Sequence, residues 1–205
     1  MKSLTQHITE KLVLNNKTKV KKYNYHPKTT AELKELVKKL IGERGNDADL
    51  NDIDTSAITD MLNLFLESEF NGDISLWNVS NVTNMRFMFC NSKFNGDISN
   101  WDVSNVTTMA NMFYSSKFNG DISKWDVSKV KDMEYMFGCS EFTGENGDIS
   151  GWDVSSVEKM NIMFAGSKFN QDISKWDVSK VKIMQGMFMG CPIKDEYKPK
   201  FNEIK

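Results

Sequence analysis

The sequence has very few of the residues on which most catalytic and metal sites depend. Its 205 residues include only two histidines, His7 and His26, and only three cysteines, Cys90, Cys139 and Cys191. Neither histidine has a cysteine near it, and no nucleophile elbow, phosphate-binding loop or metal-ligand spacing occurs. Serine and aspartate are plentiful but recur in every repeat, whereas a catalytic residue is normally singular. We therefore expect a protein that is not an enzyme and that has no catalytic, cofactor or metal site.

Long apolar runs are absent as well. No stretch reaches the roughly 18 apolar residues of a membrane-spanning helix, so no membrane span is expected. The first eight residues lack the apolar core of a secretion signal, and no cysteine follows them closely to take a lipid. These absences favour a cytoplasmic or virion-associated location over a secreted one. The cysteines are expected to be free thiols, because successive ones lie two repeats or ~10 Å apart, beyond disulfide reach.

The net charge is only −2, but the charges are unevenly distributed: the start of the chain is basic and the rest is acidic. Residues 1–45 hold 11 Lys/Arg and 4 Asp/Glu, whereas residues 46–205 hold 15 and 24. The lysine-rich residues 17–28 leave open a patch for nucleic acid, membrane or an acidic partner. Only Tyr23 and Tyr25 offer stacking there, and the rest of the chain is acidic, so nucleic-acid binding is not expected.

The basic head contains one clear helix signal. Thr29 and Glu32 fit a capping box, an apolar stripe follows them over residues 31–44, and Gly42 or Gly45 would end the helix. The stripe consists of Leu33, Leu36, Val37, Leu40 and Ile41. This helix is expected to cover the apolar edge of the first repeat. Residues 3–12 predict a second short helix and residues 17–25 an edge strand, and the role of residues 1–28 stays open.

What the sequence has in abundance is a repeat. The unit F-N-G-D-I-S-x-W-D-V-S returns with tryptophans spaced by 24, 24, 27 and 24 residues, which is typical of stacked repeat proteins. The tryptophan column is Trp77, Trp101, Trp125, Trp152 and Trp176. A disguised first copy has Ile53 in this column. The chain thus divides into a basic head with a capping helix (residues 1–45), six repeats of which the first is atypical (46–192) and a C-terminal cap (193–205).

The second half of each repeat reads V-x-x-M-x-x-M-F. Apolar residues at i, i+3, i+6 and i+7 indicate one face of a short helix, and the methionines and phenylalanines are interpreted as core. The preceding stretch G-D-I-S-x-W reads as a short strand. The predicted fold class is therefore α/β: a leucine-rich-repeat-like solenoid of six strand–helix units of about 24 residues with a parallel sheet, an N-terminal helical cap and a degenerate C-terminal cap.

The pattern F-N-G-D-I-S-x-W-D-V-S-x-V-x-x-M-x-x-M-F resembles the BspA-like repeat family, also described as the Listeria/Mycoplasma lipoprotein-type repeat. The resemblance covers about residues 46–192 and implies a leucine-rich-repeat solenoid. It also implies a bacterial surface protein or a phage-encoded relative, with adhesion or protein binding as the suggested role. The chain departs from surface members because it shows no signal or lipid-attachment site.

Two aspartate columns invite a calcium interpretation, because carboxylates recur in every repeat. One column is Asp73, Asp97, Asp121, Asp148 and Asp172; the other is Asp102, Asp126, Asp153 and Asp177, with Asn78 in register. Calcium needs six to eight oxygen ligands, and the glycine-dense repeat of calcium-binding β-rolls is absent. Asn, Gly and Asp also favour turns by bonding their own backbone. We expect turn chemistry here, with calcium binding left as the alternative.

Positions that differ between repeats are the candidates for recognition. Aromatic and charged side chains at such positions are the usual anchors of a protein interface. The candidate contacts with a protein partner are Arg86, Phe87, Tyr114, Tyr135, Ile162, Lys124 and Lys175. Two functions are open: a non-catalytic protein-binding scaffold, or a structural, self-associating component of a virion or cell envelope.

Overall fold

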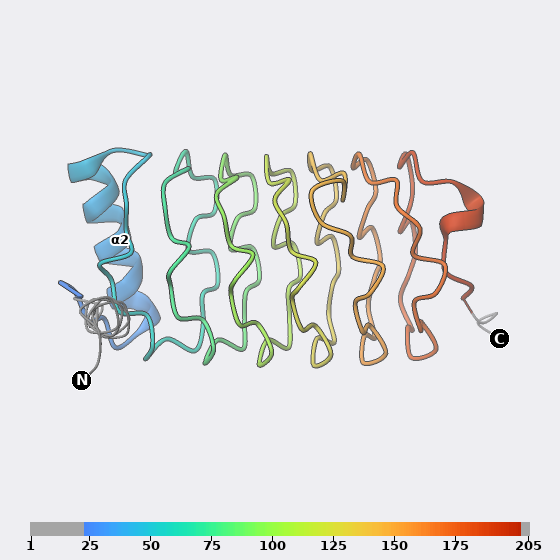
Figure 1. Ribbon diagram of the computed structural model, residues 1–205, viewed down its shortest axis with the longest axis horizontal. Coiled ribbons are helices and arrows are strands. Elements are labelled where there is room, and N and C mark those ends of the chain that lie inside the picture. The colour runs from blue at the N-terminus through green and yellow to red at the C-terminus, as the bar shows by residue number, and fades with distance from the viewer. Residues whose placement is uncertain (1–22, 202–205) are drawn as a thin grey trace, which may run out of the picture.

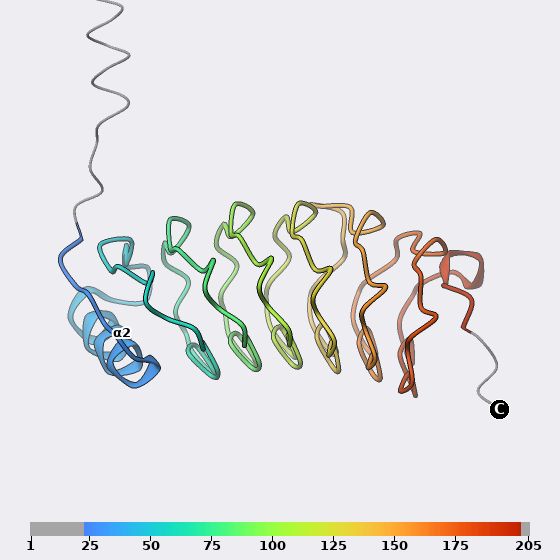
Figure 2. The same ribbon diagram turned by 90° about the horizontal axis from the view of Figure 1, so that it is seen from below.

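The structure is a computed structural model that describes residues 23–201. Figures 1 and 2 show an elongated stack of coils with helix α2 (Thr30–Arg44) across one end and the short 3-10 helix η1 (Asp195–Tyr197) at the other. Counted by the repeat, the coils comprise residues 46–69, 70–93, 94–117, 118–141, 142–168 and 169–192, and are called coils 1 to 6. The expected helix at 3–12 and most of the expected strand at 17–25 lie outside the described residues.

Helix α2 forms where the capping signal predicts it. The Thr29 hydroxyl accepts a hydrogen bond from the Glu32 N–H (3.2 Å), and the Glu32 carboxylate accepts one from the Lys28 N–H (2.7 Å). The helix ends at Gly45, whose φ of 89° favours glycine. Leu33, Val37 and Leu40 are buried on the stack, and Leu36 and Ile41 pack beside them. This confirms the predicted stripe.

The predicted fold class is wrong. Within residues 23–201 there is one α-helix, one 3-10 helix and no β-strand, and the β-type pairing between coils consists of isolated parallel bridges. Five of these bridges link one column: Asp60, Asn84, Thr108, Asp132, Lys159 and Ile183. The expected strand is bent by turns, because the Asp97 carboxylate accepts from the Ser99 N–H and the Trp101 N–H donates to the Ile98 carbonyl. The chain is a stack of turns, not a parallel-sheet strand–helix solenoid.

The expected short helices are absent because residues in their middle have positive φ. We call the nine residues at 84–92 of coil 2, and their equivalents in the other coils, the turn segment. Phe87 has a φ of 56° and Asn91 one of 54°, and a right-handed helix cannot pass through such residues. Instead, the N–H groups of Met88, Cys90 and Ser92 each donate three residues back, which makes three consecutive turns.

The core consists of side-chain columns that run along the stack. Successive rings of the column Phe65, Phe89, Phe113, Phe137, Phe164 and Phe188 stack with centroids 5.4 to 6.0 Å apart. The column Phe70, Phe94, Phe118, Phe142 and Phe169 interleaves with it. The two methionine columns are buried except at Met184. The interpretation of these columns as core is confirmed.

Each tryptophan fastens one coil to the coil before it. The Trp101 Nε1–H donates to the Ile74 carbonyl (3.3 Å), and the Trp125 Nε1–H donates to the Ile98 carbonyl (3.1 Å). The other three tryptophans repeat the bond on Leu50, Ile122 and Ile149. Because the donors are buried, they need such partners, and the bond fixes the register between coils.

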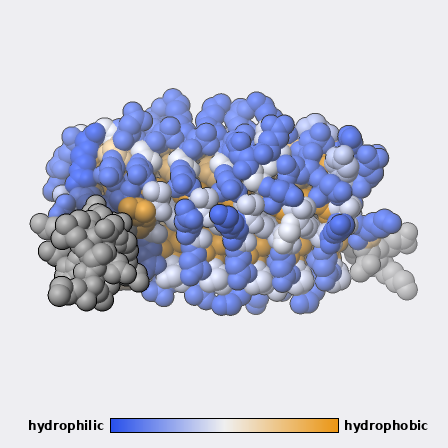
Figure 3. Space-filling view, viewed as in Figure 1, coloured by the Kyte–Doolittle hydropathy of each residue, from blue (hydrophilic) through white to orange (hydrophobic). Residues whose placement is uncertain are grey.

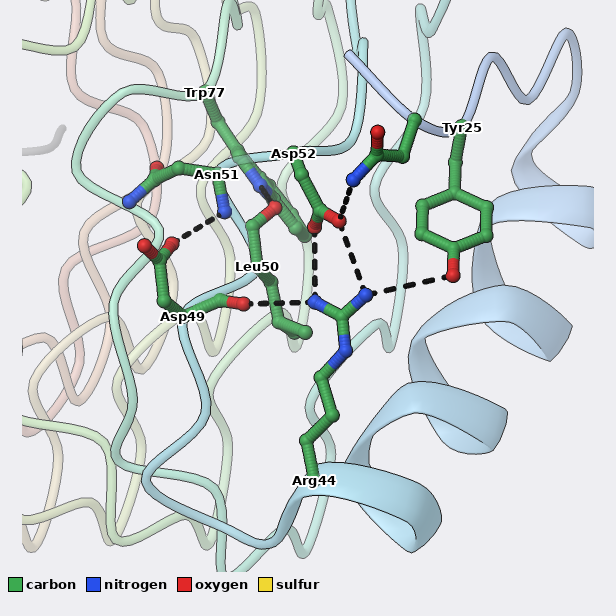
Figure 4. Close-up of polar contacts among 8 residues, drawn as sticks. Tyr25, Arg44, Asp49, Leu50, Asn51, Asp52 and Trp77 are labelled. Carbon is green, nitrogen blue, oxygen red and sulfur yellow. Dashed lines mark hydrogen bonds and ion pairs between the residues drawn. The ribbon is translucent and has the colours of Figure 1, made fainter. Parts of the chain in front are cut away.

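An ion pair joins α2 to coil 1. In Figure 4 the Arg44 guanidinium donates to both oxygens of the Asp52 carboxylate at 3.0 Å, and it also donates to the Asp49 carbonyl and the Tyr25 hydroxyl. This arrangement raises the pKa of Arg44 and lowers that of Asp52. The expected edge strand at 17–25 contributes one parallel bridge within the described residues, from Tyr25 to Ile53.

The three-residue insertion in coil 5 explains a departure in coil 6. Gln171 replaces the repeat's glycine, and its Nε2–H donates to the carbonyl of Gly144 in the insertion (2.7 Å). The side chain thus packs against the insertion at Gly144. Beyond coil 6, the Ile173 N–H donates to the Tyr197 carbonyl, so residues 193–197 continue the stack over the first half of that coil.

Candidate functional site

Residues with positive φ form two columns along the stack. The first left-handed column is Asn63, Phe87, Asn111, Tyr135, Ile162 and Gly186, and the second is Glu67, Asn91, Ser115, Cys139, Gly166 and Gly190. Asparagine and glycine suit this conformation, because glycine has no Cβ and asparagine bonds its own backbone. The repeated backbone therefore adopts positive φ at these two positions in every coil, whichever residue occupies them.

Three members of the first left-handed column suit the conformation poorly. Phe87, Tyr135 and Ile162 have φ of 56–57°, and Ile162 is β-branched, which makes it a genuine outlier. A bulky residue in this region is strained by roughly 1–2 kcal/mol. The side chains are only partly buried, so the core does not require them. They are three of the seven predicted contact residues, and all three belong to this one column.

Two further predicted residues lie against this line. The Arg86 guanidinium sits over the Phe87 ring at 5.9 Å, and the Tyr114 ring meets the Tyr135 ring edge to face at 5.9 Å. Both contacts are of the kind that holds aromatic side chains in a defined orientation. A nearby thiol, that of Cys139, raises the pKa of Tyr114. Arg86, Phe87, Tyr114, Tyr135 and Ile162 together form what we call the left-handed face.

The other two predicted contacts lie elsewhere. Lys124 and Lys175 are exposed beside Asp121 and Asp172. Hydrogen bonds from Ser123 and Ser174 lower the pKa of these two carboxyl groups, and the lysine charges add to the effect. Lys175 lines a different pocket, with Tyr197, near η1. Lys124 and Lys175, each the residue before a tryptophan, thus lie apart from the left-handed face.

The structure adds residues that sequence reasoning missed. A shallow groove of about 490 Å³ lies at the N-terminal end of the face and is lined by Leu62, Asn63, Leu66, Asn84, Arg86 and Phe87. Leu62 occupies the column of Arg86, and Leu66 occupies that of Tyr114. Aligning coil 1 on its later copies would have found both. Figure 3 shows how columns of like residues produce bands of apolar surface along the stack.

The aspartate columns make turns, as predicted. The Asp73, Asp121 and Asp172 carboxylates each accept a hydrogen bond from the N–H two residues on (2.9 Å). These bonds, backbone and side-chain, lower the pKa of all three carboxyl groups. Among the described residues, no group of three or more His, Cys, Asp or Glu side chains is placed to hold a metal ion.

Acid is therefore expected to weaken the stack. In the second aspartate column, hydrogen bonds from Ser128 and Ser155 lower the pKa of Asp126 and Asp153 below the ordinary value of about 3.8. A carboxyl whose pKa is lowered by folding stabilises the folded state above the unfolded pKa and loses that contribution as pH falls. Urea midpoints are expected to hold from pH 7 to about 5 and to fall below about 4.

Asparagine substitution tests this assignment. Asn78 already makes the same turn, since its side-chain oxygen accepts from the Ser80 N–H (3.1 Å). The triple variant Asp126→Asn, Asp153→Asn and Asp177→Asn should keep its midpoint at neutral pH and lose less of it in acid than the wild type. Asp47→Asn, at an exposed carboxylate, is the control. An unchanged acid response in the triple variant would contradict the assignment.

Comparison with known proteins places the chain in a family. Residues 31–146 and 138–197 match the model described as "Mycoplasma protein of unknown function, DUF285". The chain belongs to this family. No curated protein and no solved structure matches it. Membership in DUF285 agrees with the Mycoplasma part of the resemblance seen in the repeat. Within residues 23–201, no helix has the length and apolar character to cross a membrane.

Proposed function

We propose that this DUF285 protein is a non-catalytic scaffold that binds a protein partner through the left-handed face. The observation that carries the proposal is the strain at Phe87, Tyr135 and Ile162, which hold bulky, partly exposed side chains at positive φ. Strain of this kind clusters at functional sites.

Packing inside the stack does not explain these side chains. The same column holds Asn63, Asn111 and Gly186 in other coils, with nearly the same φ of 58–66°. A small or polar residue is therefore sufficient for the backbone. The larger side chains add apolar and aromatic surface to the exterior, where aromatic residues and arginine serve as interface anchors.

The resemblance of the repeat to the BspA-like family supports the same function, because adhesion and protein binding are the roles suggested for its members. On this proposal the chain needs no cofactor and performs no reaction. A structural role in a virion or envelope is the second candidate, and it would use the same face for contacts between copies.

Residues that the column already contains supply the test. In the triple variant Phe87→Asn, Tyr135→Asn and Ile162→Gly, every replacement suits positive φ. The thermal midpoint is expected to stay within a few degrees or to rise, because strain relief offsets the lost partial burial. A stoichiometric partner retained from source-cell lysate by the immobilised wild type should be lost.

The matched control is Lys124→Asn with Lys175→Asn, which copies Asn100 of the same column and leaves the face intact. This control should retain the partner. Equal retention by the triple variant would refute the face as the binding surface. Concentration-dependent assembly in sedimentation, abolished by the triple variant without any partner, would favour the structural role instead.

A further inference from the structure

The turn segments bond to one another in one direction only. In coil 2, the N–H groups of Met85, Phe87, Phe89 and Asn91 donate to carbonyls of coil 3. The same four bonds recur at every junction from coil 1 to coil 6. Each turn segment therefore presents donors toward the following coil and acceptors toward the preceding one. An ordinary parallel β-strand, by contrast, presents both kinds of group at each edge.

The one-way pattern follows from the turns. The carbonyls of Met85, Phe87 and Phe89 point back into their own coil, where they accept from Met88, Cys90 and Ser92. They are not free to accept from a neighbour. Positive φ at two positions in each turn segment turns every second N–H toward the following coil. Runs of N–H groups that point the same way attract anions and other acceptors.

Within residues 23–201 no turn segment follows that of coil 6, so its outward backbone groups form a row of donors. Its four outward N–H groups belong to Met184, Gly186, Phe188 and Gly190. Within residues 23–201 none of them has a hydrogen-bond partner, whereas the equivalent groups of coil 5 are all paired. Gly186 and Gly190 are exposed, and Met184 and Phe188 are partly exposed. We call this row the donor edge.

Among residues 193–201, no group accepts a hydrogen bond from the donor edge. Residues 193–197 stack on the first half of coil 6, where the Tyr197 carbonyl accepts from Ile173. The turn segment borders an open pocket of about 570 Å³ instead. Its lining is Met184, Gln185, Gly186, Met187, Phe188, Met189, Lys198 and Phe201. Met189 is 68% exposed, the largest fraction among the exposed apolar side chains.

The charge of this pocket contrasts with the rest of the array. Its lining contains one cation, Lys198, and no carboxylate, although residues 46–205 are acidic overall. Lys198 lies over the Phe188 ring at 5.7 Å and pairs with Asp195 on the side of η1. Donors, a cation and exposed apolar side chains thus meet at one end of the molecule.

The opposite end shows how this protein covers the complementary edge. There the outward groups of coil 1 are carbonyls, and α2 lies along them. The Thr30 hydroxyl donates to the Asp60 carbonyl (2.7 Å), and Lys34 and Lys38 line the groove between α2 and Leu66. The acceptor edge is thus covered by an apolar helix face, beside which lie the Thr30 hydroxyl, two lysines and the Glu35 carboxylate.

We propose that the donor edge binds an acidic peptide segment of a partner protein. Its carboxylates and carbonyls accept from the four N–H groups, and its apolar side chains contact Phe188, Met189 and Phe201. Carboxylates fit because they only accept hydrogen bonds, whereas the edge of an ordinary strand would bring its own N–H groups against the row. This site has its own lining, although Gly186 adjoins Ile162 of the left-handed face, and the proposal stands without the proposed function.

Amide NMR and hydrogen exchange on the full chain test the proposal. The probe is a synthetic nonapeptide of glutamates with two leucines and one phenylalanine. The amides of Met184, Gly186, Phe188 and Gly190 should exchange fast in the free protein, then shift and become protected as the peptide is added. The equivalent amides of coil 5 (Met160, Ile162, Phe164 and Gly166) should be protected throughout and should not shift.

Matched variants of the peptide and of the protein show whether charge and the donor edge cause the binding. The same peptide with lysine for glutamate should not bind, and Gln185→Glu with Met189→Glu should weaken binding at least tenfold. The double variant Phe87→Asn with Tyr135→Asn, which leaves Ile162 beside Gly186 unchanged, should bind the peptide normally. Shifts that map elsewhere, or no shift at millimolar peptide, would overturn the proposal. So would donor-edge amides already protected in the free protein, whether by residues 202–205 or by a second copy at high concentration.

Discussion

Replacing Gly72 with alanine is expected to lower the free energy of unfolding by about 3 kcal/mol, near the upper end for overpacking. A Cβ added at Gly72 would lie 2.1 Å from the Ala48 carbonyl oxygen and 2.8 Å from the Ala48 nitrogen. Both are backbone atoms, and the carbonyl also accepts the hydrogen bond from Asp73 that pairs coil 2 with coil 1. The Ala48 backbone cannot move away from the added Cβ without breaking its hydrogen bond with Asp73. Urea denaturation measures the loss.

Other glycines provide graded controls for this prediction. At Gly96 an added Cβ meets the Phe94 ring at 2.9 Å but stays 3.2 Å from the backbone, so Gly96→Ala should cost less than Gly72→Ala. At Gly42, inside α2, nothing lies within 4 Å, and alanine should stabilise the helix by about 0.5–1 kcal/mol. Equal losses at Gly72 and Gly96 would contradict the role assigned to the Ala48 carbonyl. In Gly72→Ala, amide exchange is expected to become faster only in α2 and coil 1, which would locate the destabilised part of the protein.

The columns of the core could be predicted from sequence, because burial repeats with the period of the chain. The tryptophan, methionine and phenylalanine columns follow from spacing alone. The α2 capping residues Thr29 and Glu32 are also visible in the sequence, since they depend on local hydrogen bonds. What these features share is that each follows from short-range chemistry or from repetition.

The secondary structure within a coil could not be obtained from the same spacing. Apolar residues at i, i+3, i+6 and i+7 fit a short helix and equally fit a run of turns. The deciding quantity is the sign of φ at Phe87 and Asn91. A hint was present, because equivalent positions hold Asn63, Asn111 and Gly186, residues that tolerate positive φ. The other coils have bulky residues at this position, which do not indicate positive φ. These bulky residues belong to the candidate face.

The candidate site could be predicted only in part for the same reason. Variable positions point to the surface, but a helix would have placed them differently from a turn. The structure brings Phe87, Tyr135 and Ile162 into one column and separates Lys124 and Lys175 from it. The donor edge had no signal in the sequence at all, since it depends on backbone direction and not on side-chain type.

Replacing Phe113 with alanine is expected to lower the free energy of unfolding by about 4 kcal/mol. Phe113 is fully buried in coil 3, and its ring stacks on Phe89 and Phe137 at 5.6 Å and on Phe118 at 4.2 Å. A cavity there removes contacts to both neighbouring coils. Because each coil of a repeat protein is stabilised mainly by its neighbours, a central defect weakens two junctions at once.

The same column contains its own control. Phe188, in coil 6, is partly exposed, and within its column it stacks on Phe164 alone, at 6.0 Å. Phe188→Ala should therefore cost less than half as much as Phe113→Ala, although the chemical change is identical. Phe113→Leu, which keeps most of the volume, should fall between them. Equal losses at the two phenylalanines would mean that stability depends on the residue type and not on its neighbours along the stack. Guanidinium denaturation of the three variants decides between these outcomes.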